Sequence, residues 1–276
     1  MEGPRMEDKD LNSRRDKIFD LIIRSYIETA EPVGSRTISK HYKIGLSSAS
    51  IRNVMADLED QGLIMQPHTS AGRVPTDKGY RYYVDRLMEL EEPTDEEKEW
   101  IQSELVRART IEGLMEKVSK VISKLTDSAA LIYLKSLKRV SFLNYLLDDL
   151  IEAEKLGSFL EEEPEIFVEG TFRIFEQPEF QDIQKMRLLL QAFDEKVVLL
   201  RILVEDLDEE GVQVHIGKEN KMGEFRDVSL VLKDCYMGHT PIGGVAVVGP
   251  TRMKYSKVVP IVDFVADTMT EAMQRF

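Results

Sequence analysis

Apolar side chains at helical spacing predict three helices in the first part of the chain, over 11–29, 36–42 and 48–61. Ser35 and Ser47 stand directly before the second and third segments, where a hydroxyl can accept a hydrogen bond from a free backbone N–H group. The predicted order is a longer helix, a short helix, a turn and a second capped helix. This is the order of a helix-turn-helix unit.

A pair of extended segments with a polar loop follows these helices. Residues 63–65 and Val74 are apolar, and the loop between them, 66–73, is polar and rich in turn residues. Gly72 in this loop is expected to adopt a turn conformation that a side chain would strain. Thr76 then caps a predicted fourth helix. Together with the three earlier helices, this pattern predicts a winged helix-turn-helix in which the loop is the wing.

The rest of the chain predicts a helical connector and an α+β unit. Residues between 94 and 125 indicate one or two amphipathic helices. Their apolar stripe fits packing within the chain's own domain, and it also fits a helix shared between two subunits. Helices are expected over 178–204 and 256–275, with Pro260 in the first turn of the latter. Strands are expected over 129–134, 139–143, 165–169, 213–216, 229–234 and 244–248.

The charge is unevenly distributed over the 276 residues, whose net charge is −13. Residues 1–86 hold 14 basic and 13 acidic side chains, whereas residues 87–276 hold 23 and 37. Within 33–86 there are 8 basic and 5 acidic side chains. Salt screens phosphate attraction within about 10 Å, so this attraction is local. A mildly basic module attached to an acidic body can therefore bind DNA.

The predicted helix over 48–61 has a face suited to DNA. Its apolar residues gather on one side, and two alanines leave the other side without bulk. Asn53 can pair with adenine, and Arg52 can reach guanine or phosphate. An ordinary solvated helix in a three-helix core remains the alternative. The predicted DNA contacts from this helix, the segment before it and the wing are Ser35, Arg36, Ser47, Ser48, Ala49, Ser50, Arg52, Asn53, Ala56, His68, Thr69, Ser70, Gly72 and Arg73.

The pattern of residues gives little support to an enzymatic function. The four histidines and the single cysteine are scattered without metal-ligand spacing. Cys235 and His239 lie four residues apart, but no second pair accompanies them. The segment 238–244 lacks the Lys-Ser/Thr pair of a phosphate-binding loop, and a strand preceded by a turn explains it better. We expect no catalytic residue, no metal and no cofactor. With no apolar leader and no membrane span, the chain is expected to be cytoplasmic.

Long motifs at both ends of the chain resemble one known family. The segments 31–36 (EPVGSR), 46–59 (LSSASIRNVMADLE), 67–80 (PHTSAGRVPTDKGY), 211–217 (GVQVHIG) and 249–255 (GPTRMKY) are similar to the HrcA heat-inducible transcription repressors. The resemblance implies a winged-helix domain and a GAF-like domain interrupted by a dimerising insertion. It also implies a nucleoid-associated bacterial repressor of chaperone genes, which acts as a homodimer on an inverted-repeat DNA operator called CIRCE and needs a GroEL-type chaperonin.

These inferences predict an α+β protein with a winged-helix domain at 1–90, a helical connector at 91–127 and a GAF-like domain at 128–276. The dimerising insertion is expected near 144–175, and the chain is shorter than the family pattern between Phe142 and Phe159. A ligand-responsive regulator, with the GAF-like domain as small-molecule receptor, is the alternative function. A winged helix that binds protein is a third. The apolar residues expected at the dimer contact, or otherwise in the chain's own core, are Phe142, Tyr145, Leu146, Leu147, Leu150 and Ile151.

Overall fold

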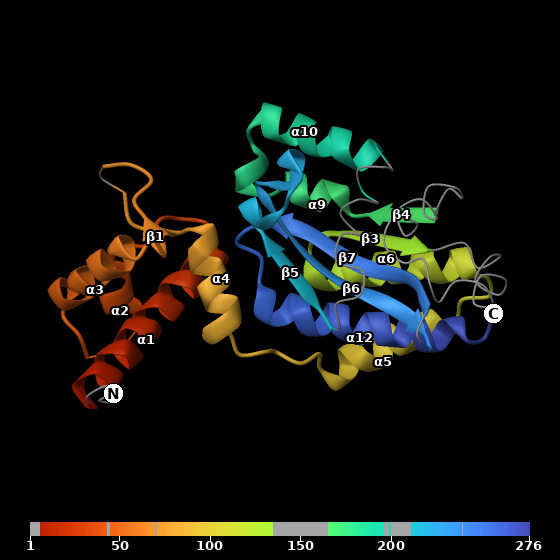
Figure 1. Ribbon diagram of the computed structural model, residues 1–276, viewed down its shortest axis with the longest axis horizontal. Coiled ribbons are helices and arrows are strands. Elements are labelled where there is room, and N and C mark those ends of the chain that lie inside the picture. The colour runs from red at the N-terminus through yellow and green to blue at the C-terminus, as the bar shows by residue number, and fades with distance from the viewer. Residues whose placement is uncertain are drawn as a thin grey trace, which may run out of the picture. The chain divides into compact units, whose positions relative to one another are not determined.

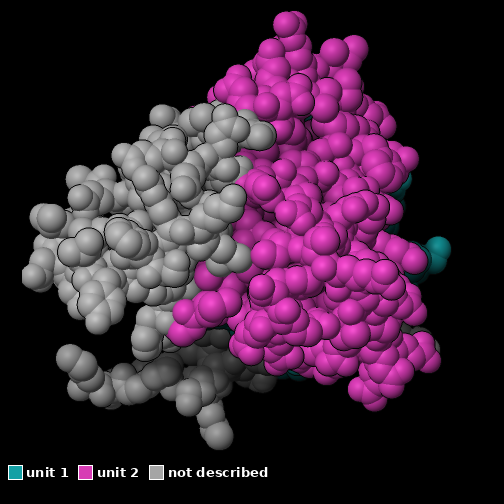
Figure 2. All heavy atoms as spheres, turned by 90° about the vertical axis from the view of Figure 1, so that its right-hand side faces the viewer, with its two compact units in different colours: residues 1–89, 251–256 teal, residues 90–250, 257–276 magenta. Residues whose placement is uncertain are grey.

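The computed structural model describes residues 6–42, 45–69, 71–134, 165–195, 199, 211–238 and 240–276. They form a protein of mixed helix and sheet (Figure 1). Contacts within the chain define two compact units (Figure 2). The N-terminal unit comprises Met1–Glu89 together with Thr251–Ser256, and the C-terminal unit comprises Leu90–Pro250 and Lys257–Phe276. A short segment from late in the sequence therefore belongs to the N-terminal unit.

The N-terminal unit has the element order that the apolar pattern predicts. Its helices pack around a core to which every helix contributes, and its two short strands pair antiparallel, with Ile64 opposite Pro75 and Met65 opposite Val74. The elements are α1 (Met6–Thr29), α2 (Ser35–His41), α3 (Ser48–Asp60), β1 (Ile64–Met65), β2 (Val74–Pro75) and α4 (Asp77–Arg86).

Two of the three predicted helix caps are confirmed, and the predicted start of α1 needs correction. The Ser47 hydroxyl accepts a hydrogen bond from the N–H of Ser50 at 3.1 Å, and Thr76 caps α4 in the same way. The expected cap at Ser35 is wrong: Gly34 precedes α2 as the capping residue. Helix α1 begins at Met6 rather than at residue 11 because the added turns are polar and leave no apolar stripe to detect.

A five-stranded antiparallel sheet organises the C-terminal unit. Its spatial order is β4-β3-β7-β6-β5, so the central strand β7 comes late in the sequence. The predicted strands are confirmed where the structure describes them, although the last two are longer than expected; 139–143 lies outside the described residues. The strands are β3 (Ala129–Leu134), β4 (Glu165–Glu169), β5 (Gln213–Ile216), β6 (Val228–Met237) and β7 (Thr240–Pro250).

Helices cover both faces of this sheet (Figure 1). On one face, Leu131, Leu230 and Ala246 join a core with Leu189 of α10. On the other face, α6 packs against β3, β4 and β7, and the Cys235 thiol of β6 meets the backbone of α12. The stripe of α6 thus packs within its own unit. The helices are α5 (Asp95–Val106), α6 (Ile111–Thr126), α9 (Thr171–Phe175), α10 (Ile183–Asp194) and α12 (Tyr255–Met273).

Two expectations about the later helices need correction. The helix predicted from residue 178 starts at Ile183, because Asp182 caps it and a 3-10 turn at Pro178–Phe180 precedes it. Pro260 lies inside α12, in its second turn rather than its first. Its ring leaves the carbonyl of Ser256 without the usual backbone donor. Two further 3-10 turns, Gly217–Glu219 and Gly223–Phe225, lie between β5 and β6.

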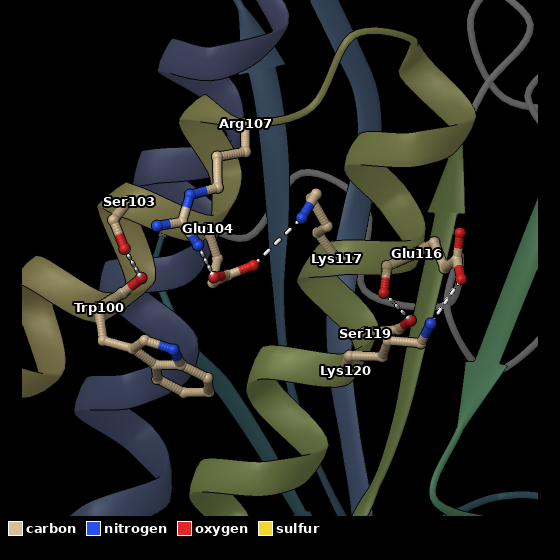
Figure 3. A network of polar contacts seen from close by, with 8 residues as sticks. All are labelled: Trp100, Ser103, Glu104, Arg107, Glu116, Lys117, Ser119 and Lys120. Carbon is tan, nitrogen blue, oxygen red and sulfur yellow. Dashed lines mark hydrogen bonds and ion pairs between the residues drawn. The ribbon is translucent and has the colours of Figure 1, made fainter.

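Polar contacts hold α5 and α6 together as a hairpin (Figure 3). The Glu104 carboxylate of α5 receives hydrogen bonds from Arg107 and from Lys117 of α6, the latter at 3.1 Å. These cations lower the pKa of Glu104, with the Lys117 hydrogen bond as the largest cause. The Lys124 ammonium lies 4.7 Å from the centre of the Trp100 ring, a cation–π contact between the same helices. Trp100, the single tryptophan of the chain, therefore reports on the fold of the C-terminal unit.

The segment between β5 and β6 depends on one buried amide. The Asn220 side chain is 5% exposed and donates to the carbonyls of Gly217, Phe225 and Val228 at 2.9–3.0 Å. Backbone acceptors away from water need such donors. The contacts fold the segment so that Phe225 enters the core.

We expect Asn220→Ala to lower the free energy of unfolding by about 1–3 kcal/mol, because buried carbonyls lose their donor. Urea denaturation followed by Trp100 fluorescence measures this change. Glu224→Gln is the control, since Glu224 is exposed in the same segment. Equal unfolding midpoints for the wild type and Asn220→Ala would contradict this role of the amide.

Candidate nucleic-acid interface

Helix α3 exposes small and polar side chains to solvent on one side. Its inner side is buried through Ile51, Met55 and Leu58. Among the described residues, neither Arg52 nor Asn53 is held by a side-chain hydrogen bond or ion pair, so both are free to meet a ligand. The exposed residues of its outer side are Ala49, Ser50, Arg52, Asn53 and Ala56.

The serines near the start of α3 are engaged in internal hydrogen bonds. The hydroxyls of Ser35 and Ser48 lie 3.0 Å apart and link the first turns of α2 and α3. The hydroxyls of Ser47 and Ser50 also lie 3.0 Å apart, at the exposed N-terminal end of α3. The structure therefore uses Ser35 and Ser48 to fix one helix against the other. Arg36, the next residue of α2, is exposed.

The loop between β1 and β2 is shaped by a side chain that sequence reasoning missed. The Gln66 amide donates to the carbonyls of Thr69 and Ala71 at 3.0 and 3.1 Å, and the N–H of Ala71 donates to the carbonyl of His68. His68 and Thr69 are exposed at the tip, and Ser70 lies outside the described residues. A glutamine at the base of a polar loop carries no distinctive pattern, so only the tertiary structure shows its role.

Gly72 is needed for a close backbone approach. A Cβ atom built there would lie 2.6 Å from the backbone of Pro32 and Val33. Directly beside it, Val33 and Arg73 exchange two backbone hydrogen bonds of 2.8 and 2.9 Å. Gly72 does not have a positive φ angle, so the expected turn conformation is not its reason. The absence of a side chain lets the loop lie against the segment between α1 and α2.

Arg73 connects the loop to the last turns of α3. Its Nε and Nη2 atoms lie 2.9 and 2.8 Å from Oε2 of Glu59. This ion pair offsets one of the acidic groups at the C-terminal end of α3, where Asp57 and Asp60 are exposed. The ion pair thus fastens the loop to the C-terminal end of α3. Sequence reasoning predicted Arg73 at the site but missed Glu59, because the pair joins residues distant in sequence.

The remaining candidate groups show no comparable arrangement. Burial raises the pKa of the Cys235 thiol to about 12, so the thiol stays protonated at neutral pH. His239 lies outside the described residues, as do the six residues predicted at a dimer contact. Among the residues that the structure describes, no cluster of His, Cys, Asp or Glu is placed to hold a metal ion. In the same part of the chain, no helix has the length and apolar character to cross a membrane.

Comparison with known proteins identifies the family. Residues 134–259 match the family described as "HrcA protein C terminal domain". The heat-inducible transcription repressor HrcA of Desulfitobacterium hafniense is 32% identical over 95% of this chain and 98% of its own length. The HrcA protein of Syntrophobacter fumaroxidans is 30% identical over 96% of this chain and 98% of its own length.

A solved structure shares the fold. A protein described only as hypothetical superposes with a TM-score of 0.67 and 23% sequence identity, covering 95% of this chain and 98% of its own. At this identity the similarity concerns the fold alone. The functional assignment rests on the sequence relatives, which are transcription repressors rather than enzymes. The chain belongs to the HrcA family of heat-inducible transcription repressors.

Proposed function

We propose that this protein represses chaperone genes by reading an inverted-repeat operator of the CIRCE type through a winged helix-turn-helix. The observation that carries the proposal is the exposed side of α3, where Arg52 and Asn53 stand between the small residues Ala49 and Ala56. Small side chains let a helix enter the major groove closely, and Arg and Asn are the side chains best matched to guanine and adenine edges.

The charges at the two ends of α3 favour an orientation in which its N-terminal end faces the DNA. Its N-terminus, at Ser47, has free N–H groups and a positive dipole end, which suit a phosphate oxygen. Its C-terminus carries Asp57 and Asp60, which DNA would repel. The N-terminal half of α3 therefore enters the groove, and the loop 66–73 serves as a wing along the backbone. The predicted contacts of His68, Thr69 and Ser70 belong to this wing.

We also propose a homodimer. One recognition helix covers only half of an inverted repeat, so two copies related by a two-fold axis are needed. The proposed contact is the insertion near 144–175, with the domains at 1–90, 91–127 and a GAF-like domain at 128–276. Of this insertion, β4 and α9 belong to the sheet unit. Its apolar residues from 142 to 151 lie outside the described part of the chain.

Control by a GroEL-type chaperonin is the last part of the proposal. In the sheet, Ala129 of β3 pairs with Val248 of β7, so strands that are far apart in the sequence must meet. Such non-local pairing is slow and leaves apolar surface exposed during folding. Self-repulsion among the excess acidic residues of 87–276 further weakens the compact state. These features support dependence of the repressor on a folding assistant.

The reading role of α3 is tested by footprinting on the DNA upstream of the protein's own gene. Arg52→Ala and Asn53→Ala should each weaken operator binding by about 1–3 kcal/mol and relax sequence preference, because a base contact is lost. The control is Arg81→Ala, which removes a half-buried arginine of α4 that pairs with Asp85. An unchanged footprint and salt dependence in both α3 variants would show that another surface reads the operator.

The wing is tested through Arg73. We expect Arg73→Ala to weaken specific and non-specific DNA binding alike and to lower the salt slope by about one unit, as loss of one phosphate contact does. Glu59→Gln separates this contact from the internal ion pair, since it leaves the guanidinium in place, and should keep the wild-type slope. A normal slope for Arg73→Ala would limit this side chain to holding the loop on α3.

The chaperonin proposal is tested by refolding from denaturant with and without a GroEL-type chaperonin and ATP. Recovery of operator binding should be faster and more complete with chaperonin, because the non-local sheet folds slowly. Recovery of Trp100 fluorescence, followed in parallel, reports on the C-terminal unit. Equal and complete recovery under both conditions, with operator binding unchanged across the heat-shock range, would refute the mechanism and favour the ligand-responsive alternative.

A further inference from the structure

The segment Thr251–Ser256 completes the N-terminal unit, although it directly follows β7 in the sequence. It is folded on itself: the Tyr255 hydroxyl donates to the carbonyl of Thr251 at 2.6 Å, and the N–H of Tyr255 donates to the carbonyl of Met253 at 2.9 Å. Met253 and Tyr255 are buried. A closed and buried turn of this kind holds its side chains in defined positions.

Arg252 of this segment caps α1. Its Nη1 atom donates to the carbonyl of Ile27 at 3.0 Å. Ile27 lies in the last turn of α1, where carbonyls have no donor within the helix and where a positive charge is favoured by the helix dipole. The neighbouring carbonyl of Tyr26 is satisfied by the N–H of Ala30. Arg252 thus supplies a donor that α1 cannot obtain from its own backbone.

Tyr255 packs on α4. Its ring lies 6.0 Å from that of Tyr80, at an interplanar angle of 54°, and both rings are buried. Helix α4 begins immediately after β2, and α1 runs to within a few residues of α2. The segment therefore contacts the two helices that precede and follow α2, α3 and the wing in sequence.

The chain on both sides of the segment belongs to the sheet unit. Before it, β7 pairs with β3 and β6. After it, α12 packs on the sheet and is tied to β6 by Lys233, which lies within ion-pair distance of Asp263 and Asp267. Disorder in β7 or α12 would remove the constraint that holds the turn in place.

We propose that Arg252 and Tyr255 are positioning residues for DNA reading, which keep α1 and α4 in the arrangement that α3 and the wing require. They do so only while β7 and α12 are folded, so the folded state of the C-terminal unit is transmitted to the reading unit through this turn. The inference rests on the proposed role of α3. Neither side chain is assigned a contact with DNA.

The test compares Arg252→Met with Arg252→Lys on a duplex that carries the footprinted inverted repeat. Arg252→Met removes the donor and the charge while keeping a long stem, and should weaken binding roughly tenfold with an unchanged salt slope. Arg252→Lys should recover most of the affinity, because an ammonium can donate to the same carbonyl. Arg226→Met, at an exposed arginine of the C-terminal unit, is the matched control.

Two further readouts separate positioning from a general folding defect. The circular dichroism spectrum of Arg252→Met should match that of the wild type at the temperature of the binding assay. Amide hydrogen exchange without DNA should be faster in the last turn of α1 and in α4 of Arg252→Met, and normal in Arg252→Lys.

If the wild type binds the duplex through Arg52 and Arg252→Met binds it with the same affinity, the inference about Arg252 is wrong and the proposed function stands. A loss that Arg252→Lys does not repair, or that comes with a loss of secondary structure at the assay temperature, would overturn it too. Absence of any operator binding by the wild type would instead overturn the proposed function.

Discussion

The position of β7 at the centre of the sheet is the constraint on which most of this protein depends. It brings residues from both ends of the C-terminal unit together, and it needs glycine to do so. A Cβ at Gly244 would lie 2.4 Å from the Tyr133 ring, which crosses β7 so that its hydroxyl donates to Asp234 of β6. Burial then raises the pKa of Tyr133 well above its usual value. One polar contact thus spans three strands, and β7 ends where the turn 251–256 begins.

In the N-terminal unit, α3 is exposed on one side and is held in place by contacts with neighbouring segments. The hydrogen bond between Ser35 and Ser48 joins α2 to α3, and Arg73 joins the loop 66–73 to Glu59. Gly72 allows the backbone of this loop to lie against Val33. These contacts lie beside or behind the outer side of α3. None of these contacts uses Arg52 or Asn53, which leaves both side chains available for a partner.

Much of this arrangement follows from local pattern, and the remainder depends on tertiary contacts. Ser47 and Thr76 cap helices as predicted, because a hydroxyl and an N–H three residues later are close in any sequence that begins a helix there. The roles of Glu59, Gln66 and Arg252 were not predicted, since their partners are set by the folded chain. In the sequence, the motif around Arg252 shows only a resemblance to a family, and its physical role depends on the carbonyl of Ile27, which the fold brings within hydrogen-bond distance.

The two units differ in how far apart in the sequence their contacting residues lie. Within Met1–Glu89 the contacts span fewer residues than the pairing of β3 with β7, which joins Ala129 to Val248 and is the slower kind to form. The turn 251–256 completes the N-terminal unit and extends directly from β7, so this unit shares part of its packing with a segment that the sheet holds in place. If Arg252 and Tyr255 position α3 as proposed, loss of the pairing between β3 and β7 would reach α3 through this turn, and DNA reading would depend on the folded state of the C-terminal unit.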